Sequence, residues 1–191
     1  MVIDRVFIEK AYIQAITEVI GTMAGVKLEA VSAILNQAAE NLEEKSGIVV
    51  NIDSLVQGAA DDEIIGRRDA EPLNRTNRIT GAMLLPGAHN ALLLMSVSKD
   101  SAAQITAFMT GLEVGQLSAE DITDGVTELV NLTAGRMRAS FYETEYDFKI
   151  TAPFALVGSD YTLFQKSNVE RIFVDFIGAG VVLTLEAYFL D

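Results

Sequence analysis

The chain has 191 residues, half of them apolar, which is enough to bury a substantial core in one domain or in two fused half-domains. It has no cysteine and a single histidine, so disulfides and thiolate metal sites are excluded, and a histidine-based metal cluster or Ser-His-Asp triad has almost nothing to draw on. Its 27 acidic and 14 basic residues give a formal net charge of −13, which disfavours nucleic acid and anionic lipid as partners.

The N-terminal segment lacks a basic start followed by an apolar core, so no signal peptide is expected. A helical apolar pattern then runs from about residue 7 to residue 24, and Gly25 is its predicted end. The predicted core face of this helix consists of Ile16, Val19, Ile20 and Met23. Residues 27–44 fit either a strand leading into a helix or one more helix, and residues 47–52 fit a strand. The polar stretch 57–77 indicates a loop or insertion.

A β-hairpin is predicted next, with strands over 79–85 and 91–97 around a turn rich in proline, glycine and asparagine. His89 lies in this turn and is interpreted as a turn residue rather than as a ligand or base. A helix is expected over 98–109, with Ser98 as its N-cap.

A long amphipathic helix is expected over 121–141, capped near Ser118. A strand interrupted by Pro153 follows over 148–156. The apolar C-terminal stretch, 172–190, carries two acidic residues and a Gly-Ala-Gly turn, so it predicts a second hairpin rather than a membrane span. The chain is therefore expected to be cytoplasmic and to have an α+β fold, in which an antiparallel sheet packs on long helices.

The two long helices are related in sequence. Residues 17–25 (TEVIGTMAG) align with residues 127–135 (TELVNLTAG), and four of the nine positions are identical. The alternative is chance similarity between two amphipathic helices. If the likeness is a repeat, the fold consists of two helix-plus-strands halves, each contributing one long helix.

One face of the second helix carries a polar stripe. On a helical wheel, Asp124, Glu128, Asn131 and Gly135 fall within about 60° of each other. The opposite side, which is expected to face the core, consists of Val126, Leu129, Val130, Thr133 and Met137. Asparagine and glycine lower helix propensity, glycine by about 1 kcal/mol relative to alanine. Their presence on this stripe favours a role other than stability, although an ordinary solvated helix face fits the same pattern.

The spacing from Asp124 through Glu128 and Asn131 to Gly135 resembles the signature of the CheC/CheX/FliY chemotaxis phosphatases, [DS]-x-x-x-E-x-x-N-x-x-x-G. Residues 79–111 and 150–158 are similar to this family's central hairpin and helix and to its proline-containing strand. The resemblance implies a single CheX/CheC-like phosphatase domain over residues 1–191, with an insertion around residues 27–77.

The first helix carries an incomplete copy of the motif. It keeps Glu18 and Gly25, but Gly21 stands where the asparagine is expected and Gln14 replaces the aspartate or serine. A chain with one complete copy resembles the CheX-type members of the family, and the first helix is expected to be structural.

The resemblance implies a mechanism. The substrate is the aspartyl phosphate of a CheY-like response regulator, which brings its own Mg²⁺ and a lysine, so the chain needs no cofactor of its own. Asn131 is expected to orient the attacking water, and Glu128 to pair with the regulator's lysine. Asp124 and Gly135 are assigned to partner binding, and a homodimer is expected. The alternatives are a non-catalytic module that binds a regulator or chemotaxis complex, and a structural motor-switch subunit.

Overall fold

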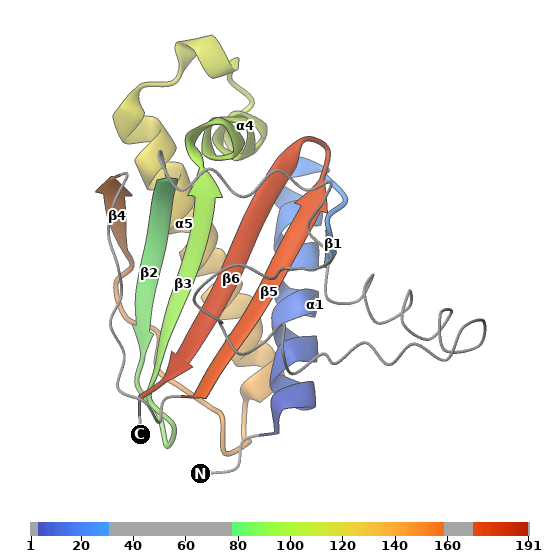
Figure 1. The fold of residues 1–191 in the computed structure, drawn as a ribbon, viewed down its shortest axis with the longest axis vertical. Coiled ribbons are helices and arrows are strands. Elements are labelled where there is room, and N and C mark those ends of the chain that lie inside the picture. Colours follow the sequence, from blue (N-terminus) through green and yellow to red (C-terminus); the bar gives the residue numbers. More distant parts are fainter. Residues whose placement is uncertain (1–3, 31–77, 159–169, 191) are drawn as a thin grey trace, which may run out of the picture.

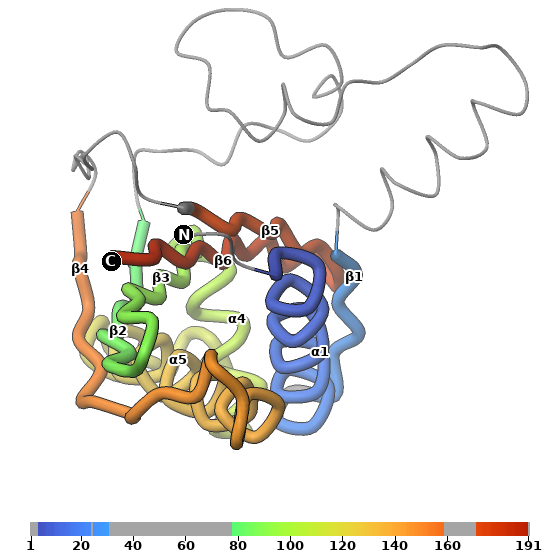
Figure 2. Tube along the Cα trace, turned by 90° about the horizontal axis from the view of Figure 1, so that it is seen from below, coloured from blue at the N-terminus to red at the C-terminus, as the bar shows by residue number. Residues whose placement is uncertain are grey.

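The computed structural model describes residues 4–30, 78–158 and 170–190. These residues form one six-stranded antiparallel sheet with long helices on one face, as Figures 1 and 2 show. This is the predicted α+β class. The possible strand and helix over 27–44, the strand over 47–52 and the loop over 57–77 lie outside the described residues, except that Glu29–Ala30 form the short strand β1.

Helix α1 spans Arg5–Ala24 and ends at Gly25, whose φ of 61° gives the left-handed cap that the sequence predicts. On its predicted core face, Ile16, Val19 and Ile20 are buried. Met23 is a correction to that prediction. It is 40% exposed, because it lies in the last turn, as the penultimate residue of the helix.

The hairpin of β2 (Arg78–Leu85) and β3 (Ala91–Ser98) confirms the central prediction. Helix α4 spans Lys99–Thr110 and begins at Ser98, whose hydroxyl accepts a hydrogen bond from the Ser101 backbone N–H at 3.1 Å. The first helical residue, Lys99, is thus one residue after the predicted start at Ser98.

Helix α5 spans Ala119–Phe141 and begins two residues before the predicted start at 121, directly after the predicted cap at Ser118. Ser118 and Asp121 form a reciprocal capping box at its start: each side chain accepts from the other residue's backbone N–H, at 3.1 and 2.8 Å. These bonds satisfy backbone donors that a helix N-terminus otherwise leaves unpaired. They also place the acidic first turn of α5 at the positive end of the helix dipole.

Strand β4 spans Phe154–Gly158, shorter than the predicted strand over 148–156. Pro153 has no backbone N–H to donate, so pairing with β2 begins only at the next residue. Phe148 instead makes an isolated bridge to Gly87. The last hairpin, β5 (Glu170–Gly178) and β6 (Val181–Phe189), confirms the prediction for the C-terminal stretch.

The strand order is β1-β5-β6-β3-β2-β4. If the chain is divided into α1-β1-β2-β3 and α5-β4-β5-β6, exchanging corresponding strands of the two halves reverses this order onto itself. Two helix-plus-strands halves related by a twofold axis would give this arrangement. The sequence repeat itself stays a prediction, with which the strand order is compatible.

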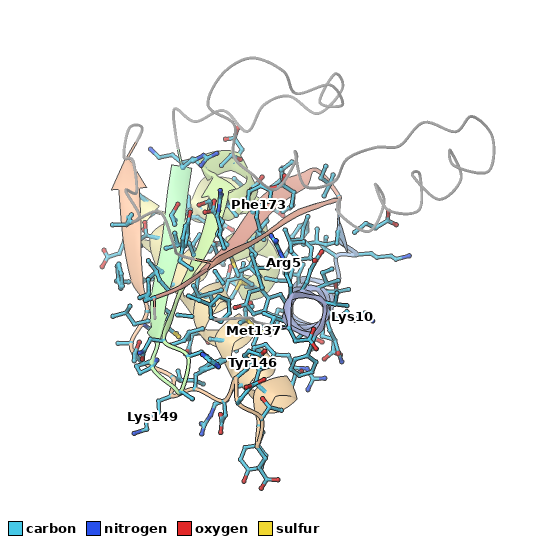
Figure 3. All side chains as sticks on the ribbon, turned by 60° about the horizontal axis from the view of Figure 1, so that its bottom comes forward. Arg5, Lys10, Met137, Tyr146, Lys149 and Phe173 are labelled. Carbon is cyan, nitrogen blue, oxygen red and sulfur yellow. The ribbon has the colours of Figure 1, made fainter. Side chains whose placement is uncertain are left out.

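The core lies between the sheet and the helix layer. Helices α1 and α5 lie side by side on one face of the sheet, and α4 lies at one end of that layer (Figures 1 and 2). Met137 of α5 is fully buried and points into this layer, whereas Lys10 of α1 points away from it (Figure 3). None of the described helices is long and apolar enough to cross a bilayer.

Candidate functional site

Helix α5 presents its polar stripe outward because its opposite side is completely buried. Val126, Leu129 and Val130 have no exposed surface, and the rest of the predicted core face, Thr133 and Met137, is also buried. Burial of each apolar side chain of this size stabilises the folded protein by about 1.5–3 kcal/mol. These residues therefore fix the rotation of the helix about its axis. Glu128 is therefore exposed and Asn131 is half-buried at the surface, on the face that the wheel predicts.

The two side chains lie next to each other. The Asn131 side-chain N–H donates to a Glu128 carboxylate oxygen at 3.4 Å, which is at the long end for a hydrogen bond. Within the described part of the chain, no cation pairs with Glu128. The carboxylate and the amide are thus arranged side by side and can be redirected together toward a partner at little cost.

The flanks of the stripe are open. Asp124 is exposed one turn before Glu128, and its backbone carbonyl accepts from the Thr127 hydroxyl at 2.8 Å. A Cβ built on Gly135 would meet nothing within 4 Å. The glycine is therefore not required by packing inside the chain, and its lack of a side chain leaves the helix backbone open to close approach from outside.

The incomplete motif on α1 has different surroundings. The Glu18 carboxylate accepts from Gln14 at 2.7 Å with one oxygen and pairs with Arg136 of α5 through the other. Hydrogen bonding to Arg136, and then to Gln14, lowers the pKa of Glu18 below its usual value. Gly21 is exposed with open space around it, and Gly25 ends the helix. Both oxygens of Glu18 thus have partners, whereas among the described residues Glu128 has only the weak contact to Asn131.

The His89 ring lies 5.5 Å from the Tyr146 ring, in the turn between β2 and β3, with its Nε2 4.0 Å from a carboxylate oxygen of Glu145. Among the described residues, no three or more His, Cys, Asp or Glu side chains group as metal ligands would. Two charged pairs in the polar stretch 57–77, the acidic Asp61-Asp62 and the basic Arg67-Arg68, lie outside the described residues.

A sequence model of one protein family, described as chemotaxis phosphatase CheX, matches residues 79–177, more than half of the chain and the whole of α5. The chain belongs to the CheX family. No match was found among curated proteins.

Solved structures of CheX and CheC-like proteins have the same fold as this CheX-family chain. CheX from Vibrio vulnificus superposes with a TM-score of 0.63 at 16% identity, covering 95% of both chains. A CheC-like superfamily protein from Shewanella sp. PV-4 gives 0.65 at 17% identity, over 97% of this chain and 99% of the other. The CheX of a CheX–CheY–BeF3–Mg²⁺ complex from Borrelia burgdorferi gives 0.61 at 12% identity over the full length of both chains.

Sequence reasoning missed three residues through which α5 packs against its neighbours in this CheX-family protein: Gly81 on β2, and Gly125 and Arg136 on α5 itself. Arg136 gives no sequence signal, because an arginine on a polar helix face is ordinary. Gly81 and Gly125 do carry one: a glycine inside a strand or a helix often marks a close backbone approach. Gly81 lies against Val130, and Gly125 lies against Thr106 of α4.

Proposed function

We propose that the chain is a phosphatase that hydrolyses the aspartyl phosphate of a CheY-like response regulator. The observation that supports this most is the adjacent, outward-facing pair Glu128 and Asn131 on α5 in a CheX-family fold. In the Borrelia burgdorferi complex a CheX protein is bound to CheY together with BeF3 and Mg²⁺. For this chain, the proposal requires a phosphorylated CheY-like response regulator as the partner.

The chemistry assigned to Asn131 is positioning of water. Its amide can accept from the attacking water and donate to a phosphoryl oxygen without changing its own charge. The water oxygen forms a new bond to phosphorus as the acyl–phosphate P–O bond breaks, which gives inorganic phosphate and the free aspartate. Holding the water in line replaces a bimolecular encounter by an arranged one, so the contribution is mainly entropic.

Glu128 is assigned to anchoring. Its carboxylate pairs with the regulator's lysine, and in doing so exchanges the 3.4 Å contact to Asn131 for a stronger charge-assisted bond. The Asn131 amide is thereby released toward the phosphate. Asp124 adds negative charge one turn away, and Gly135 allows the partner's backbone to approach. Mg²⁺ belongs to the regulator, where it supplies charge neutralisation on the phosphoryl group.

The test is the decay of a phosphorylated CheY-like regulator with substoichiometric chain. Asn131→Ala and the nearly isosteric Asn131→Asp should each lose at least about 100-fold in kcat, while retaining binding of a BeF3-activated regulator. Glu128→Ala should lose binding and rate together. Wild-type decay that is stoichiometric rather than catalytic would instead support a non-catalytic binding module. Rapid turnover by Asn131→Ala would contradict the proposed role of the amide.

We also propose that the protein is cytoplasmic, because that is the compartment in which it would meet a chemotaxis regulator.

The proposal further includes a homodimer. Among the described strands β4 lies at one edge of the sheet and pairs with β2, and we place the second copy against its outer side. Light scattering of the purified chain, at concentrations spanning the micromolar range, should give twice the monomer mass. A monomer mass throughout would remove this part of the proposal.

A further inference from the structure

We infer that Gly81 of β2 and Gly125 of α5 are positioning residues that set the depth of the site-bearing turns of α5. This rests on the proposed function, because their effect on activity is exerted through Glu128 and Asn131. The two glycines allow close contacts in two directions: Gly81, on the sheet, faces α5, and Gly125, on α5 itself, faces α4.

Gly81 allows α5 to approach the sheet closely. A Cβ built on Gly81 would lie 2.5 Å from Cγ2 of Val130, and 3.2 Å from both Cγ1 and the backbone oxygen of Val126. Carbon atoms in contact are normally about 3.5–4.0 Å apart, so even an alanine would push the helix away from the sheet by the order of 1 Å. Val130 immediately precedes Asn131, so the displacement would occur at the site itself.

Gly125 has the same role at the crossing of α5 with α4. A Cβ built on it would lie 2.2 Å from Oγ1 and 2.9 Å from Cγ2 of Thr106. Thr106 is 1% exposed, and its hydroxyl has no hydrogen-bond partner within the described structure. Thr106 is therefore enclosed by packing, and the space it occupies is available only because residue 125 has no side chain.

Both glycines cost stability where they stand. Glycine inside a helix costs about 1 kcal/mol relative to alanine, and glycine inside a strand also weakens it. Gly125 lies three residues before Glu128, so a shift at this crossing would move the whole turn that carries the carboxylate and the amide. A misplacement of about 1 Å can reduce a rate about 100-fold when catalysis depends on holding a water in line.

The decisive experiment compares Gly125→Ala with the double variant Thr106→Ala/Gly125→Ala. Removing Oγ1 and Cγ2 of Thr106 leaves only its Cβ, at 3.0 Å from the built atom, so most of the clash disappears. Gly21→Ala is the matched control, because this helical glycine has nothing within 4 Å and lies on α1 outside the proposed site. Each variant is assayed for kcat and KM on a phosphorylated CheY-like regulator and for thermal unfolding.

We expect Gly125→Ala to lower kcat by at least about tenfold while KM changes less than threefold. The double variant should return to within about threefold of the wild-type kcat, and Gly21→Ala should keep it. A purely structural role would instead lower the active fraction and leave kcat per folded molecule unchanged. The Asn131 side-chain amide resonances supply a readout independent of activity: they should shift in Gly125→Ala and return in the double variant.

The inference is overturned if folded Gly125→Ala keeps kcat within twofold of wild type, or if the double variant shows no recovery. If Gly125→Ala does not fold, the same readouts on Gly81→Ala, with Val130→Ala as the compensating change, decide in the same way. Failure of the proposed function is separately recognisable. In that case the wild type shows no turnover, while the amide resonances still report whether α5 has moved.

Discussion

Glu18 of α1 and Arg136 of α5 form an ion pair that joins the two long helices at the surface of the helix layer. Glu18 is the residue that aligns with Glu128 in the second helix. Position 26, which corresponds to Arg136 in the same alignment, is a buried valine, so Glu128 has no equivalent basic residue opposite it. The two aligned glutamates therefore differ in availability, in addition to the difference between Gly21 and Asn131.

Arg136→Gln should release Glu18. The pKa of Glu18 is lowered mainly by its hydrogen bond to Arg136, so in the variant it should rise toward the usual value, with the Gln14 bond retaining part of the shift. A carboxyl-detected NMR titration measures it directly. An unchanged Glu18 titration would show that the pair does not persist in solution.

The same pair has a pH signature. Because the folded-state pKa of Glu18 is depressed, the stabilisation is fully present above the unfolded-state pKa and is lost as pH falls through the folded-state value. Wild type should therefore lose more stability than Arg136→Gln on acidification, and the difference should shrink in high salt, since both side chains are about 41% exposed. Urea denaturation at several pH values and salt concentrations measures this.

Gly135→Ala should separate stability from partner binding. The built Cβ meets nothing within 4 Å, so alanine should raise the free energy of unfolding by up to about 1 kcal/mol. The same methyl group would stand on the face assigned to the regulator, so affinity for a BeF3-activated regulator should fall. Gly21→Ala, which adds a methyl group at an open helical position on α1, should gain similar stability without losing affinity. Equal affinities for the two variants would remove Gly135 from the docking surface.

Ser118→Ala should weaken the start of α5. It removes the hydroxyl that accepts from the Asp121 backbone N–H and that also bonds the Asp121 carboxylate at 2.7 Å. The cost should be about 1 kcal/mol in unfolding free energy. The pKa of Asp121, which is lowered mainly by the Ser118 hydroxyl and then by its backbone N–H, should rise. Calorimetry and an NMR titration test the two parts separately, and a stability equal to wild type would contradict the cap.

Leu129→Ala should destabilise the core without changing the exposed stripe. Leu129, which lies between Glu128 and Val130 in the sequence, is fully buried. Removing its side chain should lower the free energy of unfolding by about 2–5 kcal/mol. Val6→Ala, at an exposed position on α1, is the control and should change stability by less than about 0.5 kcal/mol. Chemical denaturation of both variants measures the two changes in unfolding free energy. A loss for Leu129→Ala as small as that for Val6→Ala would show that Leu129 is not tightly packed.

Much of the helix and strand pattern was predictable, because the chemistry that specifies it is local. Ser118 and Asp121 supply the start of α5, Gly25 supplies the end of α1, and Pro86 to Asn90 supply the turn between β2 and β3. Periodicity also placed Glu128 and Asn131 on the exposed face. These predictions depend only on neighbours within a few residues.

The errors and omissions arise from contacts between distant segments. The start of β4 is set by where pairing with β2 begins, directly after Pro153, and the exposure of Met23 by where the helix layer ends. The Glu18–Arg136 pair joins residues 118 positions apart. Gly81 and Gly125 are visible as glycines in the sequence, but only the fold shows which side chains occupy the space beside them.

The symmetric strand order has an evolutionary consequence. If the two halves are a repeat, exchanging them maps the sheet onto itself and puts α1 and α5 in equivalent places, so that either could display a docking surface without any change of backbone. Whether such a protein serves its partner from one face or from two is then decided by a few surface side chains. Lineages could gain or lose a face by point substitution while the core stays as it is.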